Sequence, residues 1–156
     1  MNLQKLPSIL CLILMMSHIV VAAPLEKRVQ LSVDIIANNP SPDLEILVDR
    51  GDFLIVYNQS LQKFLPLNIP LKVRSVSGMS VDYNLSIFQL DGLCDGSGPL
   101  IPTASIDDVA MTLNQPYRFS GIENTHLLTL SFPFLSQSML PGQCSGAAGL
   151  IAELVV

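Results

Sequence analysis

The sequence contains few of the side chains that carry catalysis or bind metals. It has 2 histidines, 3 cysteines and no tryptophan, and only 13% of its 156 residues are charged. Nucleophilic catalysis needs a base beside the nucleophile, and no signature pairs His126 with a serine. A Gly-rich phosphate loop and a paired-histidine metal motif are also missing. These absences argue against an enzyme, and we expect neither a cofactor nor a metal site.

The charge balance excludes another class of partner. The formal net charge is −5, and an acidic chain is poorly suited to nucleic acid or to anionic membrane surfaces. Asp107 and Asp108 could suggest a cation site, but calcium loops space their ligands at alternate positions. We interpret this pair as a solvated turn, and His126 as an exposed or hydrogen-bonded histidine at the start of a strand.

The N-terminus has the pattern of an export signal. Lys5 supplies a positive charge, residues 9–21 are apolar apart from Ser17 and His18, and small residues follow at Ala22 and Ala23. This order of a positive region, an apolar region and a small-residue cleavage site is typical of secretory signals. We predict a signal peptide over residues 1–22 and one exported domain over residues 23–156. A retained N-terminal anchor is the alternative.

Cleavage would remove Cys11 and leave two cysteines, Cys94 and Cys144. In an exported chain, two cysteines most simply form one disulfide. A metal site would need more ligands than these two and His126 supply. The sequence therefore predicts a Cys94–Cys144 bond.

Apolar residues alternate along the chain, and no sustained helical stripe is present. Residues 25–35 form one such segment, with apolar side chains of one parity at Leu25, Val29, Leu31, Val33 and Ile35. Alternation of this kind predicts a half-buried strand. Further strands are expected at residues 44–48, 53–57, 64–75, 81–87, 128–134 and 147–156, and a weaker one at 106–113. Many short strands with turns between them indicate a sandwich or a barrel.

Two of these segments have features of their own. Pro66 and Pro70 cannot donate to a ladder, so residues 64–75 should lie at an edge or switch sheets. The last segment places Ala148, Leu150, Ala152, Leu154 and Val156 on one face. The sequence ends there with nothing further to pair that edge, and an open apolar edge needs a partner.

The mature N-terminus resembles the opening of colonisation-factor (coli surface antigen type) fimbrial major subunits, pilins of the alternate chaperone–usher family. The matching stretch is LEKRVQLSV, residues 25–33. Three other places agree: residues 44–52 with the turn Asp49-Arg50-Gly51, the spacing of Tyr57 and Phe64, and the ending Gly142-Gln143-Cys144-Ser145-Gly146. Cys144 stands where the family usually has an aromatic residue.

The resemblance implies a fold and a function. Such pilins are immunoglobulin-like β-sandwiches that lack their last strand. A periplasmic chaperone lends a strand first, the N-terminal extension of the next pilin subunit then replaces it, and an outer-membrane usher exports the fibre. On this reading residues 25–36 form the donor strand, and Leu150, Ala152, Leu154 and Val156 line the acceptor edge. The protein would pass through the periplasm to a cell-surface fimbria and support adhesion.

A second hypothesis belongs to a different class. Residues 25–35 could instead be the ordinary first strand of a closed sandwich. The protein would then be a monomeric secreted or periplasmic binding module. The sequence names no receptor in either case.

Overall fold

A computed structural model describes residues 30–96, 98–136 and 143–155, and every regular element in them is a β-strand. The predicted export signal and the first residues of the mature chain, Leu25 and Val29 included, lie outside this part. No helix long and apolar enough to cross a membrane occurs among the described residues. The predicted all-β fold is confirmed.

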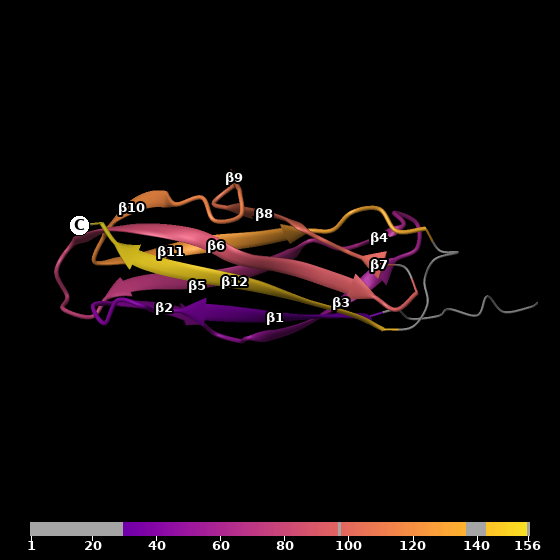
Figure 1. The fold of residues 1–156 in the computed structure, drawn as a ribbon, viewed down its shortest axis with the longest axis horizontal. Coiled ribbons are helices and arrows are strands. Elements are labelled where there is room, and N and C mark those ends of the chain that lie inside the picture. The colour runs from indigo at the N-terminus through magenta and orange to yellow at the C-terminus, as the bar shows by residue number, and fades with distance from the viewer. Residues whose placement is uncertain (1–29, 97, 137–142, 156) are drawn as a thin grey trace, which may run out of the picture.

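The strands form two sheets that run along an elongated body (Figure 1). Sheet A has the spatial order β10-β6-β12-β1-β3-β4, and β7 pairs with the end of β6. Its strands are β1 (Gln30–Asn38), β3 (Asp52–Asn58), β4 (Lys63–Phe64), β6 (Val81–Cys94), β7 (Gly98–Pro99), β10 (Tyr117–Gly121) and β12 (Cys144–Leu154). Sheet B has the order β2-β5-β11-β8-β9. Its strands are β2 (Leu44–Val48), β5 (Leu67–Ser75), β8 (Thr103–Ile106), β9 (Val109–Met111) and β11 (Glu123–Ser131).

The two sheets share one hydrophobic core. Alternate residues of the long strands point inward because successive side chains of a strand lie on opposite faces. Fully buried side chains come from both sheets, among them Ile69, Leu71, Tyr83, Leu85, Ile87, Leu128, Leu130 and Leu150. The alternation seen in the sequence therefore identifies the inner face of each sheet.

One predicted strand is two strands in different sheets. β4 pairs with β3 in sheet A, whereas β5 pairs with β2 and β11 in sheet B. Pro66 lies between them, as expected for a segment that switches sheets. Pro70 lies inside β5, one residue before the β2 ladder begins at Leu71. The N–H group that Pro70 lacks is therefore not missed in the β2–β5 ladder.

Three expectations for the middle of the chain need correction. The strand predicted at 81–87 continues to Cys94, because its ladder with β12 extends from Tyr83 to Cys94. The weak strand predicted at 106–113 is the hairpin β8–β9, because Asp107 and Asp108 adopt φ angles of 50° and 66° and turn the chain. The strand predicted at 128–134 ends at Ser131, and Phe134 is exposed.

Candidate functional site

The N-terminal strand β1 lies inside sheet A, between β12 and β3 (Figure 1). It is parallel to β12 from Leu31 to Asn38 and antiparallel to β3 from Gln30 to Asp34. Among the ladders of the described residues, the β1–β12 ladder is the parallel one, and the others are antiparallel. We use the name acceptor groove for the position between β12 and β3 that β1 occupies.

The strand register places the predicted donor positions against buried neighbours. Leu31 lies opposite Cys144 of β12 and Ile55 of β3. Val33 lies opposite Gly146 and Phe53, and Ile35 lies opposite Ala148. The opposing residues Cys144, Ile55 and Ala148 are all buried. The ladder therefore pairs Leu31 and Ile35 of β1 with buried residues of the neighbouring strands.

Asp34 and Ile36 belong to the other parity of β1. Asp34 and Ile36 are both exposed, and Asp34 lies directly opposite Asp52 of β3. Like charges in directly opposite positions destabilise a sheet. Parallel pairing is also slightly less stable per residue than antiparallel pairing. Both features reduce the stability of β1 pairing within its own chain.

The predicted acceptor edge is only partly beside β1. Leu150 lies opposite Ala37, the second-last residue of β1. Ala152 and Leu154 pair with Leu85 and Tyr83 of β6, beyond the end of the β1 ladder. Ala152 is fully buried and Leu154 is partly buried. Val156 lies outside the described residues. The β12 residues that pair with β1 are Cys144–Ile151. This set begins before residue 147, where the sequence predicted the last strand to start.

The predicted disulfide is confirmed, and it lies at the start of the acceptor groove. Cys94 and Cys144 are joined by an S–S bond of 2.02 Å and lie directly opposite each other in the β6–β12 ladder. Both residues are buried. Cys144 is also the partner of Leu31, where the β1–β12 ladder begins. The disulfide therefore holds β12 to β6 at the end of the acceptor groove where the β1–β12 ladder begins.

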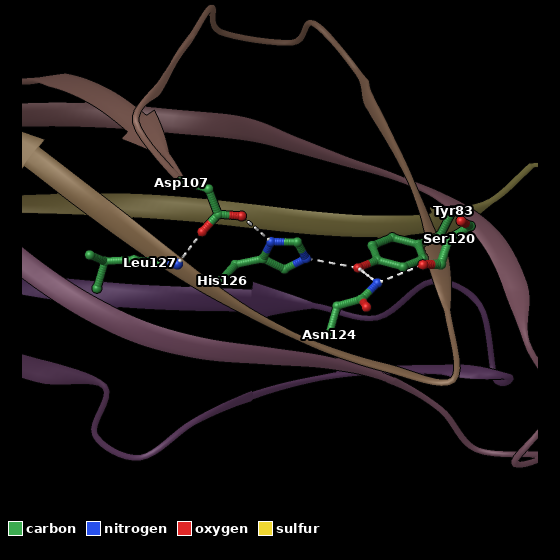
Figure 2. Close-up of polar contacts among 6 residues, drawn as sticks. All are labelled: Tyr83, Asp107, Ser120, Asn124, His126 and Leu127. Carbon is green, nitrogen blue, oxygen red and sulfur yellow. Dashed lines mark hydrogen bonds and ion pairs between the residues drawn. The ribbon is translucent and has the colours of Figure 1, made fainter.

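A polar network links the two sheets at the edge of the core (Figure 2). The Tyr83 hydroxyl of sheet A lies 2.8 Å from Nε2 of His126 in sheet B. Nδ1 of His126 lies 2.6 Å from Oδ2 of Asp107. The Asn124 amide nitrogen is 2.8 Å from the Tyr83 hydroxyl and 3.0 Å from the Ser120 carbonyl oxygen. His126 is thus a hydrogen-bonded histidine, one of the two environments expected from the sequence.

The directions of these hydrogen bonds place the protons. The Ser120 carbonyl can only accept, so the nitrogen of the Asn124 amide faces both that oxygen and the Tyr83 hydroxyl. The hydroxyl therefore accepts from Asn124 and donates its own proton to Nε2 of His126. Nδ1 is left to donate to the Asp107 carboxylate. Both ring nitrogens of His126 have partners in this network, and because Tyr83 and His126 are 1% and 4% exposed, it acts as a link between the sheets.

Asp107 is more than the solvated turn residue that the sequence indicated. Its Oδ1 accepts from the backbone N–H of Leu127 at 2.8 Å, and its Oδ2 accepts from His126. Desolvation raises the pKa of this carboxyl, but the hydrogen bonds from His126 and Leu127 and the attraction of the His126 ring together leave the pKa below its ordinary value. No sequence signal pairs Asp107 with His126, because the β8–β11 register brings them together.

This depressed pKa predicts a pH-dependent contribution to stability. A carboxyl whose pKa is lower in the folded state stabilises the fold above its ordinary pKa, and the contribution is lost as the pH falls through the folded value. We expect Asp107→Asn to lower the melting temperature at neutral pH, and the difference from wild type to shrink below about pH 4. Thermal melts between pH 2 and 7 measure both curves. Asp108→Asn, on the neighbouring turn residue, is the control, and a pH-independent Asp107→Asn difference would contradict the assignment.

Comparison with models of known protein families finds no match, and comparison with curated proteins finds none that is similar. Within the described ranges, no group of three or more His, Cys, Asp or Glu side chains is arranged to hold a metal ion. The candidate functional site of this chain is β1 together with the acceptor groove.

Proposed function

We propose that the protein is a structural subunit of a bacterial surface pilus and polymerises by strand exchange. The observation that carries this proposal is the place of β1. This strand comes first in the described chain, yet it fills a groove in the middle of sheet A between β12 and β3. It joins the rest of the domain only through residues 39–43. The β1 strand of another copy has the same sequence and can pair with the same two neighbours.

The chemistry of β1 supports exchange. In the register, its positions Leu31 and Ile35 pair with Cys144, Ile55 and Ala148, and the same pairs can form with a neighbouring copy. Domain swapping exchanges an element between identical chains at low cost, because the same contacts form again. The proposal includes an immunoglobulin-like sandwich that is completed by a neighbour. It also includes a periplasmic chaperone that holds the groove, and an outer-membrane usher. The sequence resemblance supports these parts.

One observation favours the second candidate, a monomeric binding module. In this structure β1 completes the sheet of its own chain, so the sandwich has no open groove. A closed domain of this kind needs no chaperone. The two candidates differ in whether β1 leaves its own domain, and a substitution within β1 separates them.

Leu31→Asp is expected to prevent fibre assembly while the subunit still forms its complex with the chaperone. The register pairs position 31 with Cys144 and Ile55, which are both buried, so we expect a charged residue there to be unfavourable. Losing one buried aliphatic side chain costs about 1.5–3 kcal/mol, before the cost of burying the carboxylate. Gln30→Asp, at a position of opposite parity, is the control and should be mild.

Both variants are expressed with the cognate chaperone and usher. Surface fibres are then counted by electron microscopy, and periplasmic chaperone–subunit complex is measured by affinity purification. If Leu31→Asp also abolishes the chaperone complex, β1 belongs to the subunit's own core and the strand-exchange proposal is wrong. If fibres of Leu31→Asp match those of wild type, β1 is not the donor.

A further inference from the structure

The two sheets have four outer edges, and at three of them a side chain is hydrogen-bonded to the backbone of the edge strand. Sheet B ends at β2 and β9, and sheet A ends at β10 on one side and at β3 with the short β4 on the other. In β2, the N–H of Ile46 donates to the Asn39 side chain at 2.9 Å. In β9, the Ala110 carbonyl accepts from the Tyr117 hydroxyl at 2.9 Å. In β10, a backbone carbonyl accepts from the Asn124 amide at 3.0 Å. Such contacts reduce the capacity of an edge to pair with another chain.

The fourth edge, at β3, has no such contact over residues 52–56. One side of this segment pairs with β1, and β4 covers the other side only at Tyr57 and Asn58. Among the described residues, no further strand pairs with that other side of residues 52–56. Its outward side chains are apolar, since Leu54 and Val56 are 66% and 53% exposed. Lysine and proline, which commonly protect edge strands, do not occur in it. We call this side of residues 52–56 the open edge.

The chemistry of the open edge selects an extended chain as its partner. The free N–H and C=O groups of an edge are matched by an added strand, which forms main-chain hydrogen bonds along it. A helix has no free backbone groups along its length to offer in return. The partner must also bring apolar side chains beside Leu54 and Val56. A second copy of β3, with the sequence DFLIVYN, supplies both.

One antiparallel register of two β3 strands uses the whole open edge. When Leu54 lies opposite Leu54 of the second copy, residues 52–56 of each chain pair with the same residues of the other. Pairing cannot extend further, because β4 occupies that side of Tyr57. The second copy does not need that place, since its chain reaches sheet A from sheet B only at Asp52. The two open edges therefore match in length.

The charges favour the same register. Asp52 already lies opposite Asp34 of β1 within each copy. A register with Asp52 opposite Asp52 of the second copy would bring four carboxylates into one row, and like charges in opposite positions destabilise a sheet. In the register centred on Leu54, Asp52 lies opposite Val56 instead. The row of leucines then separates the carboxylates of one copy from those of the other.

We infer that two copies of this protein associate side by side through their open edges, with a two-fold axis at Leu54. Sheet A then continues from one copy into the other, and on its inner face Phe53 lies opposite Ile55 of the second copy. Ile55 belongs to the hydrophobic core and Phe53 packs against it, so the contact joins apolar side chains on both faces. A ladder of five residues is short, and small contacts of this kind form weak dimers.

The contact goes beyond the proposed strand exchange and does not depend on it. β1 pairs with the opposite side of β3. The open edge is therefore the same whether β1 belongs to its own chain or to a neighbour. The interface is isologous, because both copies contribute the same surface.

Cysteine cross-linking of the exported chain tests the register. Leu54→Cys puts a thiol at the two-fold axis, where opposite Cα atoms lie about 4.5–5.5 Å apart, within reach of a disulfide. Val56→Cys is the matched control on the same edge, because its two thiols would lie more than about 13 Å apart. Leu127→Cys, 43% exposed on the central strand β11, measures random collision. After mild oxidation we expect covalent dimers from Leu54→Cys, and at least about tenfold fewer from both controls.

Charge substitution at position 54 tests the contact without a cross-link. Leu54→Lys and Leu54→Glu should each sediment as monomers at concentrations where wild type self-associates, because like charges would lie directly opposite each other. An equal mixture of the two variants should recover the dimer. Thermal melts show that both variants are folded, and a substitution at this exposed position should change the melting temperature little.

Each contrary result is decisive. If wild type remains a monomer at its highest soluble concentration, and Leu54→Cys cross-links no better than Leu127→Cys, the contact does not exist. Equal cross-linking of Leu54→Cys and Val56→Cys overturns the two-fold register. Self-association that both charge variants retain locates the dimer contact on another surface, which also overturns the inference. None of these results bears on strand exchange, which the fibre assay of Leu31→Asp tests separately.

Discussion

Replacement of both Cys94 and Cys144 by alanine is expected to lower the free energy of unfolding by about 4 kcal/mol. The bond closes a loop with a sequence separation of 50 residues. In the chain-entropy model, a cross-link over such a loop stabilises the fold by restricting the unfolded chain. Domains of this size are commonly stable by only about 5–15 kcal/mol. The loss would therefore be a large share of the total.

The effect should be largest at the acceptor groove. Without the bond, β6 and β12 are free to separate at the residues where Leu31 begins its ladder. Urea unfolding followed by circular dichroism measures the midpoint of the double variant. Wild type treated with reductant is the matched control and should show a similar midpoint. A shift corresponding to less than about 1 kcal/mol would show that the bond is not an important restraint.

The inner faces of the two sheets could be predicted from the sequence because alternation is a local property. Tyr83, Leu85 and Ile87 follow it, and each is 1% exposed or less. The cysteine pair could be predicted because removal of the predicted export signal, which holds Cys11, would leave two cysteines and one simple pairing. Neither inference required knowledge of which strands are neighbours.

The strand order could not be predicted in the same way. The place of β1 between β12 and β3 depends on contacts between the two ends of the chain. Pro66 and Pro70 allowed either an edge strand or a segment that switches sheets, so the division into β4 and β5 could not be chosen from the sequence. The Asp107–His126 pair depends on the β8–β11 register, to which the local sequence gives no guide. Long-range pairing decides these features, and residue patterns describe only short-range order.

Removal of β1 is expected to abolish the stable fold of the isolated subunit. A chain of residues 39–156 loses the eight register pairs with β12 and the five with β3. β3 and β4 then have no ladder to the rest of sheet A, since β1 is their link to β12. We expect the truncated chain to aggregate or to lack a cooperative melt, because an apolar groove and two unpaired strand edges are exposed to water.

A peptide of residues 25–38 should restore the fold when it is present during refolding. The peptide supplies both ladders and the apolar positions that face the groove, so near-ultraviolet circular dichroism and a cooperative melt should return. The same peptide with Leu31→Asp should bind at least about tenfold more weakly, since it loses roughly 1.5–3 kcal/mol of side-chain burial. The Gln30→Asp peptide is the control of equal charge. A truncated chain that melts cooperatively as a monomer without any peptide would show that the domain is stable without β1. That result would contradict the proposal that a neighbouring copy must supply this strand.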